Sequence, residues 1–355
     1  MNFSVSELTT RHRLSLAQIH RLGWGEVPNE ELFEEKKHAL LQANHIKHIL
    51  DQLEETGIFF ICIKGVALSQ RLYQDPTVRY ARDIDILVPD KKDVIFLRQQ
   101  LLSNGWSDAD DYWVDDEPRR DWYMDLAMHH VMIDPVNGFV LEIHWSLDRL
   151  LLNIDENELE DVLKSHTEKM MVYHRKINVL SPELELIYVI AHGTRHAWFR
   201  LKWLVDVHHY PVSMVDQKTF ESLLRKYNAC GFVTYTDELL RFYFGKGFPF
   251  SVDGNANSRV LTYYKSKILG DEEESAASAV NTFRMAMNVW RITGDRNKAL
   301  NIIYSLLLIR PQDISRVKLN ALWKYYFYRY YSFLKRRFFT EEVSELKIQN
   351  WKIED

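Results

Sequence analysis

Strand-like sequence is confined to one part of this chain, and that confinement sets its fold class. Apolar, β-branched or alternating runs occur between residues 57 and 150, whereas residues 5–56 and those from Ser181 onward carry apolar side chains at three- and four-residue steps. The first pattern indicates strands and the second indicates amphipathic helices. The sequence therefore predicts an α+β protein, with an N-terminal helical segment at 1–56, a small α/β core at 57–180 and a helical C-terminal domain at 181–355.

The expected strands of the core are bounded by turn-forming residues. IFFICIKG (58–65) is solidly apolar and ends in glycine, and DIDILV (83–88) is closed by Pro-Asp. LAMHHVMID (126–134) and FVLEIHWSL (139–147) are joined by Pro-Val-Asn-Gly, which supplies the positive φ that a tight hairpin needs. Amphipathic segments at 30–56, 66–73 and 91–106 predict helices. Ser181-Pro182-Glu183 predicts a further helix, with the serine as its N-cap.

Asp83 and Asp85 are the unusual residues of the DIDILV run. Side chains alternate across a strand, so both carboxylates point to one face, roughly 6–7 Å apart. They would raise each other's pKa unless a cation lies between them. Mg²⁺ is the natural candidate, because it takes hard oxygen ligands and keeps water and phosphate oxygens in its shell. The structural alternative pairs Asp83 with Arg79 or Arg82, and Asp85 with a neighbouring lysine.

Other residues in the same segment extend this candidate site. Glu142 shares its strand face with His144, and a strand beside DIDILV would bring Glu142 up as a third acidic ligand. Three carboxylates on neighbouring strands are typical of two-metal phosphoryl transfer. Upstream, Lys64-Gly65 ends one strand and opens a helix, where backbone N–H groups and the lysine charge are suited to phosphate. Arg79 lies four residues before Asp83.

Together these motifs resemble a known family. K-G-x-A-L at 64–68, L-Y-x-D-P-x-x-R-x-x-x-D-I-D-I-L-V at 72–88 and the hydrophobic-Glu-hydrophobic-His-Trp run at 141–145 are similar to the bacterial nucleotidyltransferase-like family. That family is a branch of the DNA polymerase β-type nucleotidyltransferase superfamily. The resemblance spans roughly residues 30–210 and is sharpest between 63 and 146.

The resemblance implies a small mixed β-sheet core flanked by helices, and metal-dependent transfer of a nucleoside monophosphate from an NTP with release of pyrophosphate. Asp83, Asp85 and Glu142 match the family's acidic positions and would bind two Mg²⁺ ions, with Mn²⁺ as an alternative metal. Lys64-Gly65 stands where the superfamily carries Gly-Gly or Gly-Ser. A catalytically inactive nucleotide-binding or partner-binding module with the same fold is the alternative function.

Several more side chains are candidates for substrate contacts, beside Lys64, Gly65 and Arg79. His130 and His144 fall on the two hairpin strands, where they either contact substrate or serve as hydrogen-bonded structural histidines. Lys202 is expected to reach nucleotide phosphates from a helix packed across the cleft, or else to form a surface pair with Asp206 at i, i+4.

Composition narrows the partners but does not identify the acceptor. A net charge of -5 gives no overall reason to expect a nucleic acid or an anionic membrane. The basic aromatic run at 323–339 keeps RNA as a less favoured partner, although its helical spacing favours a core-facing helix. No run approaches the ~18 apolar residues of a membrane span. The expected acceptor is a small molecule, peptide or protein. Two distant cysteines predict buried free thiols and a cytoplasmic location.

Overall fold

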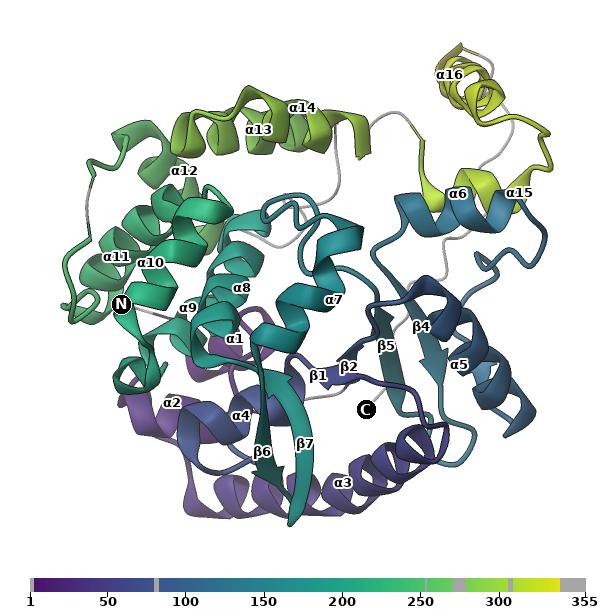
Figure 1. Ribbon diagram of the computed structural model, residues 1–355. Helices are drawn as coiled ribbons and strands as arrows, with labels where there is room; N and C mark the ends of the chain where they lie inside the picture. The colour runs from purple at the N-terminus through teal and green to yellow at the C-terminus, as the bar shows by residue number, and fades with distance from the viewer. Residues whose placement is uncertain (1–2, 80–82, 253, 271–278, 306–308, 339–355) are drawn as a thin grey trace.

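A seven-stranded mixed sheet lies at the centre of the molecule, within the part of the chain that the computed structural model describes, residues 3–79, 83–252, 254–270, 279–305 and 309–338 (Figure 1). The strands are β1 (Ile61–Cys62), β2 (Asp83–Leu87), β3 (Ser107–Asp108), β4 (His129–Ile133), β5 (Val140–His144), β6 (Thr167–Val172) and β7 (Arg175–Leu180). Their order is β3-β4-β5-β2-β1-β7-β6. The expected α+β class, with a mixed sheet and helical flanks, is confirmed.

Helices precede, interrupt and follow the sheet. They are α1 (Val5–Thr10), α2 (Leu16–Leu22), α3 (Asn29–Glu55), α4 (Gly65–Tyr73), α5 (Lys91–Ser103), α6 (Arg119–Leu126), α7 (Glu156–Ser165), α8 (Pro182–Arg195), α9 (Leu201–His208), a 3₁₀ turn (Val212–Met214), α10 (Gln217–Lys226), α11 (Cys230–Phe244), α12 (Ser258–Leu269), α13 (Ala279–Thr293), α14 (Arg296–Ile303), α15 (Pro311–Arg316) and α16 (Leu322–Phe338). Among the described residues, no helix combines the length and the apolar character needed to cross a bilayer.

The pairing of β2 places the candidate acids. This strand runs antiparallel to β1 and parallel to β5, so it is central and hydrogen-bonded on both sides. Strand β4 leads into β5 through the expected turn, in which Gly138 has φ of 64° and the Asp134 carboxylate accepts a hydrogen bond from the N–H of Asn137. The sequence signals for this hairpin and for the central strand are therefore confirmed.

The hairpin β6–β7 was not anticipated from the sequence. Its turn residues, Tyr173 and His174, both have positive φ, at 49° and 63°, yet neither is one of the residues that ordinarily signal such a turn. Strand β7 pairs in parallel with β1, and β6 forms the edge of the sheet on that side. The expected strand at 58–63 is shorter than its apolar run, since the paired residues of β1 are Ile61 and Cys62.

The apolar core covers both faces of the sheet. One buried cluster joins β1 and the loop at 147–154 to α8, α9, α11 and α13, so strands and C-terminal helices share a continuous core. A second cluster packs α3, α5 and α6 against β2, β4 and β5. Helix α3 contributes its buried stripe of Ile46, Ile49, Leu50 and Leu53, and Figure 1 shows it running along one side of the sheet.

Three local expectations are confirmed only in part. Ser181 is the N-cap of α8 and Pro182 is its first residue, as predicted, but the Ser181 hydroxyl makes no capping hydrogen bond. Cys62 is buried and free, whereas Cys230 is free but exposed at the start of α11. The helix expected at 323–339 to face the core is exposed at Tyr326 and Tyr330 of α16, whereas Tyr325 is buried.

Candidate active site

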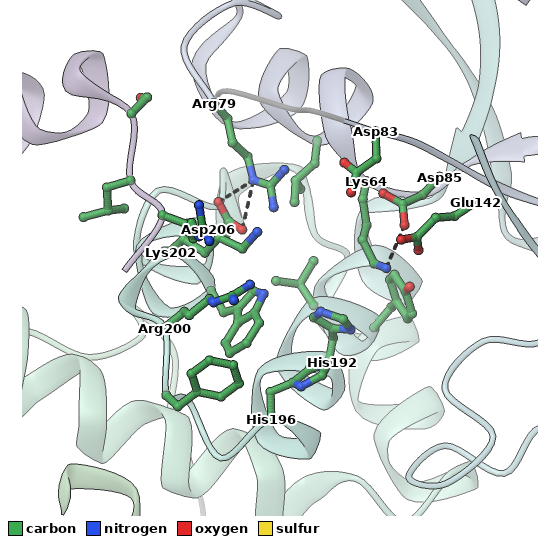
Figure 2. A pocket seen from close by; sticks show the side chains of 18 of the residues that line it. Lys64, Arg79, Asp83, Asp85, Glu142, His192, His196, Arg200, Lys202 and Asp206 are labelled. Carbon is green, nitrogen blue, oxygen red and sulfur yellow. Dashed lines mark hydrogen bonds and ion pairs between the residues drawn. The ribbon is translucent and has the colours of Figure 1, made fainter. Parts of the chain in front are cut away.

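A cleft of about 780 Å³ opens beside the central strands, a volume within the usual range for ligand pockets. Its walls come from β2, β5 and the start of α4 on one side, and from the N-terminal segment, α8 and α9 on the other. Figure 2 shows residues of both walls. The acidic wall carries Asp83, Asp85 and Glu142, together with Lys64. The facing, mainly basic wall carries Arg79, Arg200 and Lys202, together with Asp206.

The strand register brings the acids together. Asp85 of β2 pairs with Glu142 of β5, and Asp83 lies two residues earlier on the same face of β2. All three carboxylates line the cleft, as the alternation of the sequence predicts. Asp85 is 5% exposed and Glu142 is only partly buried, so the acidic group extends from the sheet towards the opening.

Asp85 already has two partners. The Nζ of Lys64 donates a hydrogen bond of 2.9 Å to Asp85 Oδ1, and His144 Nε2 lies 3.2 Å from the same oxygen. Burial opposes ionisation of Asp85, but the Lys64 ammonium and the His144 contact outweigh it and lower the pKa of Asp85. Asp85 is therefore ionised at neutral pH. This lysine contact matches the structural alternative for Asp85.

Asp83 lies in a different environment. Burial, together with the nearby charges of Asp85 and Glu142, raises the pKa of Asp83 to about 6. The pKa of Glu142 is lowered, because a hydrogen bond from His144, at 3.2 Å, outweighs the effect of burial. The three carboxylates of this wall therefore repel one another, which contributes to the raised pKa of Asp83.

The facing wall is basic. Arg79 is buried, and its Nε donates to both carboxylate oxygens of Asp206, at 2.9 and 3.1 Å. Asp206 is 1% exposed, so the expected surface pair between Lys202 and Asp206 is wrong. Lys202 lines the cleft instead. Burial and the nearby Arg79 charge lower the pKa of Lys202 to about 8, despite the opposing charges of Asp206 and Asp83.

The turn between α8 and α9 shapes this basic wall. Ala197 and Trp198 both have positive φ, and the fully buried Trp198 ring packs directly on Gly193. A Cβ at Gly193 would lie 2.3 Å from that ring, so glycine is required for the close approach. The turn directs Phe199 and Arg200 to the cleft.

Two histidines of α8 and its C-terminal turn complete the same wall. His196 stacks on Trp203 with ring centroids 4.7 Å apart, and His192 lies beside both rings. Burial, reinforced by nearby positive charges, lowers the pKa of His192 and His196 well below the ordinary value, so both are neutral. An aromatic surface therefore adjoins the cations.

The hairpin histidines separate into two environments. His144 lies among the acids, as expected, but the placement of His130 beside them is wrong. His130 points to the other face of the sheet, where its Nε2 lies 2.7 Å from Asp108 Oδ1 and its Nδ1 lies 3.4 Å from the Tyr123 hydroxyl. It is a hydrogen-bonded structural histidine. His129, its neighbour in sequence, lies in the cleft opposite His144.

The sequence contained a signal for His129, because the hairpin turn fixes the register that pairs it with His144. Other cleft residues carried no such signal. Arg13, Ser15, Glu35 and His38 reach the cleft from the N-terminal segments, far away along the chain. Gly65 starts α4 beside Lys64 with φ of 55°.

The family comparison agrees with this architecture. Residues 10–244 match a family described as "Uncharacterised nucleotidyltransferase", and this match covers more than half of the chain. The chain therefore belongs to this nucleotidyltransferase family, as the motifs in its sequence predict. A search among curated proteins finds no match. Membership supports nucleotidyl transfer as the general function, with a nucleoside triphosphate as substrate.

Proposed function

We propose that this protein is a metal-dependent nucleotidyltransferase that transfers a nucleoside monophosphate from an NTP to an acceptor and releases pyrophosphate. The observation that carries the proposal is the convergence of Asp83, Asp85 and Glu142 in one cleft, opposite a basic wall. Acids on one side suit divalent cations, and the cations facing them suit a triphosphate. The family membership of residues 10–244 supports the same chemistry.

The donor set fits divalent metal ions. Three carboxylates share the cleft, and their mutual repulsion contributes to the raised pKa of Asp83. Asp83 and Asp85 would hold two Mg²⁺ ions, with Glu142 completing the site. When bound, the ions supply positive charge for the reacting phosphate and promote ionisation of the acceptor.

The residues of the chain have separable roles in this proposal. Lys64 lies at the N-terminus of α4, within reach of phosphate oxygens that enter beside Asp85. Lys202 offers a second cation from the facing wall, while the ion pair with Asp206 holds Arg79 in place. Positioning and charge compensation of this kind provide most of the rate enhancement in phosphoryl transfer.

The transfer exchanges one phosphorus–oxygen bond for another. An acceptor oxygen forms a bond to the α-phosphorus, and the bond from the α-phosphorus to the bridging oxygen of the pyrophosphate breaks. The proton of the acceptor goes to the Glu142 carboxylate, whose lowered pKa keeps it ionised and able to accept. His144 donates to Glu142 and orients it.

A second candidate function is a catalytically inactive module that binds nucleotides or a protein partner. One observation favours it: Asp85 is hydrogen-bonded by Lys64 and His144, so its charge is compensated without a metal ion. The two functions differ in whether nucleotide binding depends on Mg²⁺ and whether the α-phosphate is transferred.

Calorimetric titration of ATP, CTP, GTP and UTP, with and without Mg²⁺, tests the proposal. We expect binding that requires Mg²⁺ and that disappears in the Asp83→Asn/Asp85→Asn double variant. The matched control is Glu160→Gln/Asp161→Asn, which removes two exposed acids of α7 away from the cleft. Unchanged, Mg²⁺-independent binding in the Asp83/Asp85 variant would refute the proposed site.

A further inference from the structure

We propose that His129, Glu142 and His144 form a site for a first-row transition-metal dication, which they bind in preference to Mg²⁺. One potential ligand atom from each of these residues lies within 4.8 Å of the other two. This proposal deepens the proposed nucleotidyl transfer, with which it shares Glu142, but it concerns the identity of the metal ion.

The distances suit a common ion. His144 Nε2 lies 3.2 Å from Glu142 Oε2. Two ligands that are each ~2.1 Å from a metal ion lie roughly 3.0–3.4 Å apart when they subtend 90° to 109° at it. These two groups, which share a hydrogen bond when no metal is bound, are therefore already spaced like neighbouring ligands, and His144 Nε2 would release the proton that it donates to Glu142 when it binds the ion. His129 closes the set through a shift of up to about 1.4 Å, since its ligand atom lies within 4.8 Å of the other two and neighbouring tetrahedral ligands lie about 3.4 Å apart.

His129 is available for such a role. Its ring lies next to that of His144, with the centroids 4.9 Å apart and the planes at 35°. Within the described part of the chain, no hydrogen-bond partner holds its ring nitrogens. By contrast, His130 on the other face of the sheet is hydrogen-bonded through both nitrogens, to Asp108 and to Tyr123.

The ligand chemistry determines which ion is preferred. Mg²⁺ takes oxygen ligands and is poorly served by imidazole, whereas Zn²⁺, Mn²⁺, Co²⁺ and Fe²⁺ accept two imidazoles and one carboxylate. Asp83 projects from β2 as part of the same acidic wall and remains an oxygen donor for a second, harder ion. The cleft thus offers one nitrogen-rich site and one oxygen-rich site.

Equilibrium dialysis of the full-length protein against Zn²⁺, Mn²⁺ and Mg²⁺ tests this inference, and the visible absorption of added Co²⁺ reports nitrogen coordination. We expect one Zn²⁺ site at least about 100-fold tighter than the Mg²⁺ site. His129→Ala and His144→Ala should each weaken Zn²⁺ binding by at least about tenfold, the loss typical even of groups that only support a ligand. His48→Ala, on the exposed side of α3, is the matched control and should leave binding unchanged.

Zn²⁺ affinity that is the same in both cleft variants as in the control would overturn the inference. Circular dichroism of each variant separates a lost ligand from a lost fold. Mg²⁺-dependent ATP binding, measured on the same preparations, keeps the two proposals apart. If the protein binds ATP with Mg²⁺ but has no histidine-dependent Zn²⁺ site, only this inference is refuted. If it has such a Zn²⁺ site but does not bind ATP, only the proposed function is refuted.

Discussion

Replacing Lys64 by methionine should have opposite effects on metal binding and nucleotide binding. The Lys64 and Asp85 side chains are 14% and 5% exposed, and their N–O distance is 2.9 Å. Lys64→Met preserves much of the side-chain volume but leaves Asp85 as a buried carboxylate without its ammonium partner. Breaking a buried pair from one side costs about 3–5 kcal/mol in the free energy of unfolding. With ~2.1 cal/mol/K of unfolding entropy per residue, that cost lowers Tm by roughly 4–7 °C for 355 residues.

The same change should strengthen Mg²⁺ binding in the absence of nucleotide. A metal ion that binds Asp85 competes with the hydrogen bond from Lys64, and a hydrogen bond to a charged group contributes about 1.5–3 kcal/mol. Its removal should tighten Mg²⁺ binding roughly 10- to 150-fold. NTP affinity should fall, because a cation that faces the phosphates is lost.

Calorimetry with Mg²⁺ alone and with Mg²⁺–NTP measures both effects. Lys64→Arg keeps the positive charge and should retain weak Mg²⁺ binding, and Lys92→Met, at an exposed position of α5, controls for loss of a surface lysine. Unchanged or weaker Mg²⁺ binding in Lys64→Met would show that Lys64 does not compete with a cation for Asp85.

Three further predictions concern the facing wall and the helical half. Because the pKa of Lys202 is about 8, half of its amine is already neutral at pH 8, so nucleotide affinity should begin to fall about one pH unit below that value and continue to fall as the pH rises, since the neutral amine no longer attracts phosphate. Calorimetry between pH 7.5 and 9.5 should show this fall, and Lys202→Arg should abolish it; an equal fall in that variant would point to another group. Gly193→Ala should cost about 1–3 kcal/mol in urea denaturation by displacing the Trp198 ring, and a cost below about 0.5 kcal/mol would contradict the packing. Lys298→Met should cost about 2–4 kcal/mol, because its buried Nζ donates to the carbonyls of Leu151, Tyr227 and Asn228, while ATP binding should persist. A variant as stable as the parent would show that these bonds contribute little.

The acidic half of the site was predictable because it rests on local rules. Alternation along β2 and β5 determines which side chains share a face, and the sharp turn before Gly138 fixes the hairpin register. The same rules predict that His129, and not His130, lies on the cleft face opposite His144, because the turn determines which residues of the two strands pair. The positions of Asp83, Asp85 and Glu142 therefore follow from short segments of sequence.

The basic half was less predictable because it depends on contacts between distant segments. Arg79 pairs with Asp206, which is 127 residues away. From the sequence alone, the simpler expectation for Asp206 was a pair with Lys202 at i, i+4. Arg13 enters the cleft from the loop before α2. No periodicity in the sequence predicts such long-range contacts, because they depend on how the helices pack on the sheet.

Nucleotidyl transfer by this protein is tested most directly by the fate of the α-phosphate. The protein is incubated with Mg²⁺, a cell extract whose own enzymes have been heat-inactivated and each NTP, labelled with ³²P either at the α or at the γ position, and incubations without the protein give the background. Protein, RNA and small-molecule fractions are then counted. Nucleotidyl transfer predicts that α-label enters one fraction while γ-label leaves as pyrophosphate, and that Asp83→Asn/Asp85→Asn abolishes the transfer. Incorporation of γ-label, or α-label transfer that persists undiminished in the double variant, would contradict it.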